Sequence, residues 1–437
     1  YVVMEVNKAM LELRRNGGGP VHINLITTYS RDFSVKELPH VKVMRRFQAW
    51  DELPVLPEGR IGIYVGSHTH FSEKQNRAID RFCATYDAVV ICDHTSGYYG
   101  KYKLLPTLVQ LQSDITSPFP PLDLMVHIGE ISAASFNDTI PAKEVWRVSE
   151  DGELRDPFKK LTTVFQMSEE MFFLHYGKDG CNRHVLIDEC RELFGEIYEQ
   201  IPELPFCNIW TAMQLSSRLP KGALFHMGVS NTRRCWNMFQ LPESVESACN
   251  VGCCGIDGCV STLVGASLVN PDRLCYVVVG DLTFFYDLNS LGNHHIGTNL
   301  RVMLVNNGRG TEFRLGIHHC NVFGDDADKY MAAAGHFGNK SPLLVKHYAE
   351  DLGFHYLSAT TKEEFMTALS NFTNPQLSDH SMILEVFTDS KDESEALYLM
   401  SHIQSDAKGM VRSKLKDAVR NVAGEKGINA IKKILKK

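Results

Sequence analysis

No stretch of the 437-residue sequence is a long hydrophobic run. None of its apolar segments approaches the roughly 20 residues that a membrane-spanning helix needs, so we expect no transmembrane segment. The sequence opens YVVMEVNKAM, with neither an initiator Met nor the basic and apolar regions of a signal peptide. These absences predict a cytoplasmic protein and a chain that begins inside a larger one.

Regular cysteine spacing and an excess of positive charge are missing as well. The twelve cysteines include no CxxC pair, so buried, reduced thiols are expected rather than disulfides or a zinc site. The formal net charge of −7 argues against a general nucleic acid-binding protein. Hydrophobic residues make up 44% and charged residues 22%, which is typical of a soluble globular protein, and the length predicts two or three domains.

The most informative stretch runs from Tyr276 to Phe313. Val277–Val279 and Val302–Val305 are apolar runs typical of buried strands, and apolar residues at helical spacing lie between them. This pattern predicts two parallel strands joined by a helix, with Asp281 and Asn307 just beyond the strand ends. One carboxylate and one amide oxygen at such an edge suit a hard divalent cation that bridges to a phosphate.

Two readings of these residues are open. In an ordinary βαβ unit the Asp would cap the helix and the Asn pair would form a turn. The separation of 26 positions from Asp281 to Asn307 instead resembles the GD(G)…NN signature of thiamine diphosphate (ThDP) enzymes. Gly280-Asp281-Leu282 followed by Tyr286-Asp287-Leu288-Asn289 resembles the menaquinone-pathway 2-succinyl-5-enolpyruvyl-6-hydroxy-3-cyclohexene-1-carboxylate (SEPHCHC) synthases. Their GIDGxxST segment is matched by Gly255–Gly258 and Ser261-Thr262.

The resemblance implies an α/β fold with two Rossmann-like parallel-sheet domains. Residues 1–30, which include GPVHINL, would be the remnant of a pyrimidine-binding domain and its linker. Residues 31–205 alternate strand and helix patterns without a GxGxxG motif and would form the central domain. Residues 206–390 would bind the cofactor diphosphate, and residues 391–437 would form a basic, helical C-terminal extension.

The resemblance also implies which residues hold the cofactor. Asp281, Asn307 and the backbone carbonyl of Arg309 would bind Mg²⁺, although the family usually has Gly where Arg309 stands. The residues expected to line the cofactor are Ser230, Ile256, Gly280, Asp281, Leu282, Asn307, Gly310 and Thr311. Ile256 would hold the cofactor in its bent conformation; by the residues alone it is equally a core aliphatic. Asp257 is expected to cap the helix that follows it.

Arg234 and His318 are the expected substrate contacts. Arg234 stands four residues beyond Ser230, in a turn that resembles the family's Gly-Asn-Ser turn but has Val229 in place of Asn. A guanidinium there could pair with an acidic group of the substrate. By the residues alone, Arg234 is as readily a surface arginine at a helix start. His318 lies in the segment after the Asn pair, which commonly folds over the site in this family; by the residues alone, His318 and His319 are more readily exposed or loop histidines.

The reaction implied is decarboxylation of a 2-oxo acid, with or without ligation to an acceptor. The family's catalytic Glu lies on the pyrimidine-binding domain, so no catalytic residue is assigned here and the chain alone is expected to be inactive. The synthases carry an acceptor-binding Arg shortly before GIDG, and Val251 stands there, which makes isochorismate a doubtful acceptor. A non-catalytic assembly protein with this fold and one half of a split enzyme are the alternatives.

The two remaining expectations concern assembly. ThDP sites of the family lie between two subunits, so a homodimer or tetramer is expected. The segment from Lys408 to Lys437 has ten Lys or Arg residues and two acidic residues. This tail could dock on the acidic remainder of the chain, or bind a membrane surface or a partner.

Overall fold

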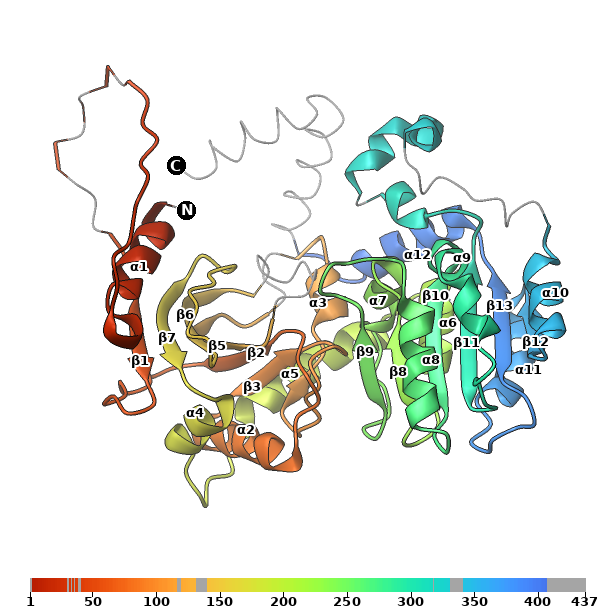
Figure 1. Ribbon diagram of the computed structural model, residues 1–437, viewed down its shortest axis with the longest axis horizontal. Helices are drawn as coiled ribbons and strands as arrows, with labels where there is room; N and C mark the ends of the chain where they lie inside the picture. The colour runs from red at the N-terminus through yellow and green to blue at the C-terminus, as the bar shows by residue number, and fades with distance from the viewer. Residues whose placement is uncertain are drawn as a thin grey trace. The chain divides into compact units, whose positions relative to one another are not determined.

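The computed structural model describes residues 2–115 apart from 30, 33, 35 and 38–40, together with residues 119–130, 140–316, 318–330 and 341–406. The chain forms two compact units. The first comprises Tyr1–Cys92, Tyr98–Leu104 and Phe119–Cys190, and the second comprises Asp93–Gly97, Leu105–Pro118 and Arg191–Lys437. Figure 1 labels most of the helices and strands of both units.

The first unit is built on a parallel sheet with the strand order β1-β7-β6-β5-β2-β3-β4. Its strands are β1 (Arg45–Gln48), β2 (Ile61–Val65), β3 (Val89–Cys92), β4 (Lys103–Leu104), β5 (Leu122–Ile128), β6 (Ala142–Val148) and β7 (Leu161–Gln166). Its helices are α1 (Val2–Glu12), η1 (Arg15–Gly17), α2 (Glu73–Tyr86) and α4 (Glu169–Tyr176), and α5 (Val185–Glu199) crosses the boundary in sequence. Strands β2 and β3 are buried along their whole length, as expected of parallel strands covered on both faces.

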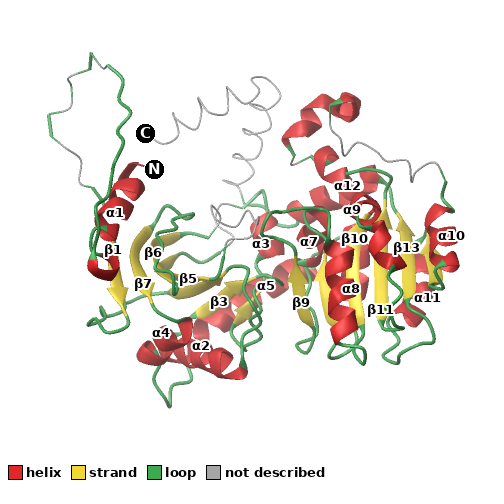
Figure 2. Ribbon diagram, viewed as in Figure 1, coloured by secondary structure: helices red, strands yellow, loops and turns green. Residues whose placement is uncertain are grey.

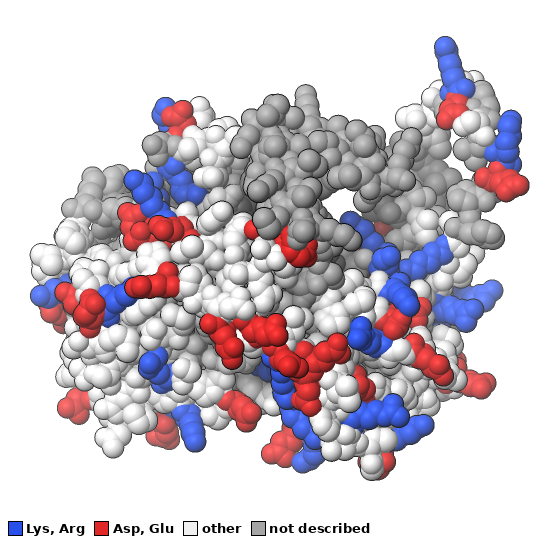
Figure 3. All heavy atoms as spheres, turned by 180° about the vertical axis from the view of Figure 1, so that it is seen from behind, with Lys and Arg blue, Asp and Glu red and all other residues white. Residues whose placement is uncertain are grey.

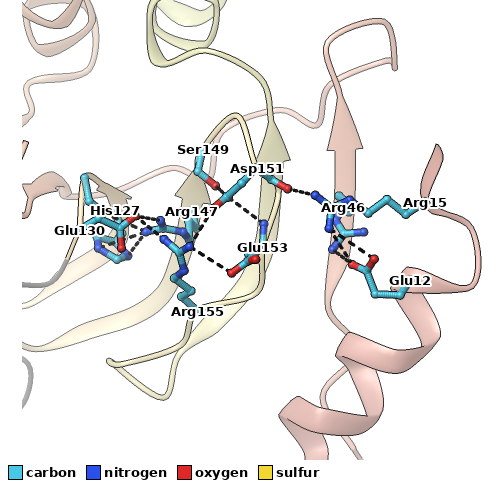
Figure 4. A network of polar contacts seen from close by, with 11 residues as sticks. Glu12, Arg15, Arg46, His127, Glu130, Arg147, Ser149, Asp151, Glu153 and Arg155 are labelled. Atoms are coloured by element: carbon cyan, nitrogen blue, oxygen red, sulfur yellow. Dashed lines mark hydrogen bonds and ion pairs between the residues drawn. The ribbon is translucent and has the colours of Figure 1, made fainter. Parts of the chain in front are cut away.

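A polar network joins the ends of β5 and β6 in this unit (Figure 4). The buried Arg147 donates to the Glu130 carboxylate at 3.2 Å, and Arg155 pairs with Glu130 and, at 2.8 Å, with Asp151. Burial and the neighbouring Arg147 lower the pKa of His127 to about 3, so this imidazole is neutral at pH 7. Both guanidinium groups therefore face carboxylates.

The second unit contains a parallel sheet with the order β12-β13-β11-β10-β8-β9. Its strands are β8 (Leu224–Met227), β9 (Glu246–Cys249), β10 (Cys275–Gly280), β11 (Leu300–Asn306), β12 (His355–Ala359) and β13 (Met382–Phe387). Its α-helices are α3 (Thr107–Leu111), α6 (Asn208–Leu215), α7 (Asn231–Trp236), α8 (Cys259–Val269), α9 (Asp281–Tyr286), α10 (Leu344–Asp351), α11 (Lys362–Phe372) and α12 (Ser390–Ser401). Its 3-10 helices are η3 (Ser216–Arg218), η4 (Leu288–Gly292), η5 (Thr311–Arg314) and η6 (His319–Lys329).

Helices cover both faces of this second sheet (Figure 2). Apolar residues of α8, α9 and α10 form one core cluster with β10 and β11. On the other face the Tyr276 ring lies 5.5 Å from Phe372 of α11, and Phe225 lies 4.9 Å from Trp236 of α7. The sheet is therefore the middle layer of a three-layer α/β sandwich, and ligand access is left to its edges.

The predicted fold class is confirmed, because both units are α/β with parallel sheets. The predicted parallel pair is present as β10 and β11, joined by α9 and η4. None of the described helices combines the length and apolar character needed to cross a bilayer. The four-part division of the chain stays a prediction, and the basic segment 408–437 lies outside the described residues.

The cysteines differ in their burial, and the surface carries charges of both signs. All twelve cysteines are described and none forms a disulfide, but Cys181, Cys253 and Cys254 are exposed, so the expected burial is wrong for these three. On the face drawn in Figure 3, basic and acidic side chains of the described residues are interspersed. A nucleic acid-binding face would instead gather basic side chains.

Candidate functional site

Most of the predicted site residues come together at the carboxyl edge of the second sheet. In the register of β8, β10 and β11, Met227 lies opposite Val278 and Gly280 lies opposite Val305. The chain segments that leave these strands therefore start side by side. They carry Ser230 after β8, Asp281 and Leu282 after β10, and Asn307, Arg309, Gly310 and Thr311 after β11.

Asp281 is the first residue of α9 and is almost fully buried. One of its carboxylate oxygens, Oδ1, accepts a hydrogen bond from the Leu282 amide at 2.7 Å. Its charge is felt by Glu385 of β13, whose pKa is raised mainly by burial and further by Asp281. Asp281 thus brings a carboxylate to the end of β10 in a region of low solvent content, where a cation would be bound strongly.

The two asparagines after β11 have different roles. Asn306 donates to the buried Glu385 carboxylate at 2.7 Å and accepts from the Gly308 amide at 3.2 Å, so it holds the turn. The Oδ1 atom of Asn307 is buried and has no hydrogen-bond partner among the described residues. A buried acceptor without a donor costs about 1–3 kcal/mol unless something binds it. The donor set of Asp281 and Asn307 therefore fits a hard cation such as Mg²⁺.

No cluster of three His, Cys, Asp or Glu side chains that could hold a metal is present in the described part of the chain. A cation at this edge would therefore need further oxygen ligands from the backbone and from a bound phosphate. This donor set, with one carboxylate and one amide, matches a metal that is bound together with its anionic ligand.

The turn after Asn307 accommodates an arginine at position 309, whose backbone carbonyl is the predicted metal ligand. The positive φ of this turn falls on Gly308, at 82°, and Arg309 is not among the described non-Gly residues with positive φ. The carbonyl of Arg309 accepts from the Thr311 amide at 2.9 Å and retains a second lone pair. Because that amide is engaged, its predicted contact with phosphate requires the turn to open. The buried Thr311 hydroxyl has no partner among the described residues and is the more direct candidate donor.

Ser230 lies in a strained turn at the end of β8. Its φ of 64° and ψ of −121° favour glycine, yet the position carries an exposed serine. Two residues earlier, a Cβ added to Gly228 would come within 3.2 Å of the Val278 carbonyl oxygen, so a larger residue there would require β10 to shift by a few tenths of an ångström. Strain of this kind costs about 1–3 kcal/mol and is concentrated at functional sites, which supports a role for the Ser230 side chain.

The two expected substrate contacts already have partners in the protein. Arg234 of α7 forms two hydrogen bonds with the carboxylate of Glu312. His318 accepts from the Cys320 amide at 3.1 Å through Nδ1, and its ring lies against Phe313. Their contact with a substrate stays a prediction.

Ile256 lies in the segment between β9 and α8 and is half-buried. Asn250 donates to the Gly258 carbonyl at 3.1 Å and to the Thr262 hydroxyl at 3.2 Å, which ties this segment to the start of α8. The expected cap at Asp257 is wrong. The cap is supplied by Asp287, whose carboxylate accepts from the Ser261 amide at 2.7 Å.

Sequence reasoning missed two acidic residues at this edge, Glu385 and Glu312. Glu385 interrupts the apolar strand Met382–Phe387, and an acid in a buried strand was a usable signal. Glu312 gave no such signal, because its partner Arg234 is 78 residues away.

Comparison with known proteins supports the motif-based resemblance, although no family model matches the chain. A protein of Bacteroides thetaiotaomicron named SEPHCHC synthase is 28% identical over 420 residues, which span 90% of this chain and 72% of that protein. A Bacteroides fragilis protein of the same name is 29% identical over 425 residues, with the same coverage. One from Christiangramia forsetii is 33% identical over 199 residues, or 46% of this chain. The chain is thus a relative of proteins named SEPHCHC synthase, in line with the resemblance of its motifs to that type of ThDP enzyme.

Proposed function

We propose that the chain carries the diphosphate-binding part of a ThDP- and Mg²⁺-dependent 2-oxo acid decarboxylase or carboligase. The observation that carries this proposal is the buried Oδ1 of Asn307, which has no hydrogen-bond partner among the described residues and lies at the strand edge that also presents Asp281. Asp281, Asn307 and the Arg309 carbonyl would hold Mg²⁺. ThDP held there would supply a carbanion able to add to the carbonyl of a 2-oxo acid and a ring able to accept the electron pair released with CO₂.

The residues of the chain would bind and orient the cofactor. Ser230, Gly280, Leu282, Gly310 and Thr311 would contact the diphosphate and its surroundings, through hydroxyls or through backbone groups close to the strand ends. Ile256 would support the cofactor from the segment that Asn250 fixes. None of these cofactor-binding residues is assigned the proton transfer of the reaction. We assign that step to a Glu of a pyrimidine-binding domain.

The acceptor is proposed to differ from isochorismate. Val251, at the position of the family's acceptor-binding Arg, is only 7% exposed, and its amide donates to the Cys249 carbonyl at 2.8 Å. A buried valine offers no charge to a carboxylate acceptor. We further propose a cytoplasmic enzyme that works as a homodimer or tetramer, because the family's sites lie between subunits.

The test is release of CO₂ from a panel of 2-oxo acids with ThDP and Mg²⁺. We expect turnover when the chain is joined to a pyrimidine-binding domain of a SEPHCHC synthase, and none from the 437 residues alone. Asn307→Ala should abolish the turnover, whereas Asp272→Ala, at an exposed position away from the strand edge, should retain it. Turnover by the chain alone would contradict the assignment of proton transfer to the other domain. Absence of turnover from every form would favour a non-catalytic assembly protein.

A further inference from the structure

A buried acid, Glu385, contacts the turn that carries the proposed metal ligand Asn307. Glu385 lies in β13 opposite Leu304 of β11, and it is 1% exposed. Asn306 lies two residues beyond Leu304, so its side chain is on the same face of the sheet as Glu385. An acid in such a place needs hydrogen-bond donors, because burying an unpaired carboxylate is costly.

Two donors hold the two oxygens of this carboxylate. The side-chain amide of Asn306 donates to Oε1 at 2.7 Å, and the hydroxyl of Tyr356 in β12 donates to Oε2 at 2.8 Å. Burial raises the pKa of Glu385, and the charge of Asp281 raises it further. Glu385 therefore lies within electrostatic range of the other proposed metal ligand.

The contact with Glu385 fixes which way the Asn306 amide group points. A carboxylate only accepts hydrogen bonds, so it holds the NH₂ group of Asn306 and leaves the amide oxygen to another partner. That oxygen accepts from the Gly308 amide at 3.2 Å. A bond of this kind, between residues two apart, is an Asx turn, and here the residue that it encloses is Asn307.

We propose that Glu385 is a positioning residue that sets the Asn307 side chain as a ligand for the metal ion. This inference rests on the proposed function. The Asx turn restricts the backbone on both sides of Asn307, whose buried Oδ1 has no hydrogen-bond partner among the described residues. Without Glu385 the Asn306 amide can rotate and exchange its bond to Gly308 for water. The Asn307 oxygen would then no longer be held at the strand edge.

The competing role for Glu385 is a purely structural one, in which it only ties β13 to β11 and β12. Tyr356→Phe removes the hydrogen bond to Oε2 and leaves the one from Asn306, whereas Glu385→Leu removes both. Asn306→Ala breaks the same contact from the other side and serves as the second variant if Glu385→Leu does not fold. Glu385→Gln can keep both bonds, since its amide oxygen accepts from Asn306 and its NH₂ group donates to the Tyr356 oxygen.

The experiment is a titration of the 437-residue chain with Mn²⁺ in the presence of inorganic diphosphate, followed by EPR and by water-proton relaxation. We expect Glu385→Leu and Asn306→Ala to bind Mn²⁺ about tenfold or more weakly, and Glu385→Gln and Tyr356→Phe to stay within about threefold of the parent chain. The bound Mn²⁺ should also gain a water ligand in Glu385→Leu, because a displaced Asn307 leaves its coordination position to solvent. A purely structural role would not add that water. Thermal unfolding checks that each variant is folded.

Unchanged Mn²⁺ affinity in Glu385→Leu and Asn306→Ala would overturn the proposal. Equal losses in all four variants would overturn it as well and leave the structural role. Asp281→Ala separates this inference from the proposed function. Binding that is lost in Asp281→Ala but kept in Glu385→Leu retains the metal site and removes the positioning role, whereas absence of binding from the parent chain removes both.

Discussion

A Phe284→Ala variant is expected to lose about 3–5 kcal/mol of stability in the second unit, the usual cost of removing a large buried aromatic ring. Phe284 lies on α9 three residues after Asp281, and its side chain is 0% exposed within the core cluster of β10, β11 and α8. The ring therefore fixes the short helix that begins with the proposed metal ligand. Its loss should weaken metal binding as well as the core.

Hydrogen exchange of the β10 and β11 amides measures this effect, because it reports on the opening of the second unit without requiring a two-state transition of the whole chain. The matched control is Tyr286→Ala on the same helix. Tyr286 is 62% exposed, so its removal should change the opening free energy by less than about 0.5 kcal/mol. Equal effects at the two positions would contradict the packing described for α9.

A Glu393→Gln variant is expected to stabilise the second unit by about 1–2 kcal/mol at pH 8, because removing the buried charge outweighs the cost of the amide N–H groups that replace Oε2, which has no hydrogen-bond partner among the described residues. Glu393 is 1% exposed, and burial raises the pKa of its carboxyl group from 4.5 to about 7. Its Oε1 accepts from the Asn208 amide and from the Thr388 hydroxyl, both at 2.9 Å. Glutamine can accept the same two hydrogen bonds without carrying a charge.

The sign of the pH dependence follows from the raised pKa. Between about pH 4.5 and pH 7 the folded state holds a proton on Glu393 that the unfolded state has lost, so the contribution of this group to stability falls as the pH rises. Hydrogen exchange stability measured from pH 5 to pH 8, after correction for intrinsic rates, should decline more steeply in the parent chain than in Glu393→Gln. Glu395→Gln, at an exposed position of the same helix, should follow the parent chain. Parallel curves for Glu393→Gln and the parent would contradict this account.

The features that could be predicted from the sequence are those encoded locally. The apolar runs of β10 and β11 and the helical spacing around Phe284 specify a strand, a helix and a strand, and the residues directly after each strand must lie at the same edge. This is why the meeting of Asp281 and Asn307 at one edge followed from the sequence. The role of Gly308 in carrying the positive φ is local too, and Arg309, where the family usually has Gly, is not among the described non-Gly residues with positive φ.

The features that escaped prediction depend on contacts between distant segments. Asp257 has the right spacing for a cap, yet Asp287 takes that role because the tertiary fold brings its carboxylate to the start of α8. Likewise, the sequence presents Arg234 as an available cation, and only the packing of η5 near α7 shows that Glu312 neutralises it. Local spacing predicts where a side chain lies, whereas its partner is set by the fold.

Calorimetric titration of ThDP with Mg²⁺ tests the central assignment most directly. The protein is the chain joined to a pyrimidine-binding domain, compared with the same protein carrying Asp281→Ala or Asp272→Ala. We predict Mg²⁺-dependent binding in the parent protein and in Asp272→Ala, and loss of about 100-fold or more in affinity in Asp281→Ala, since one carboxylate carries the protein's charge at the metal. Binding that survives in Asp281→Ala, or that is absent from the parent protein, would contradict the assignment of this strand edge as a ThDP site.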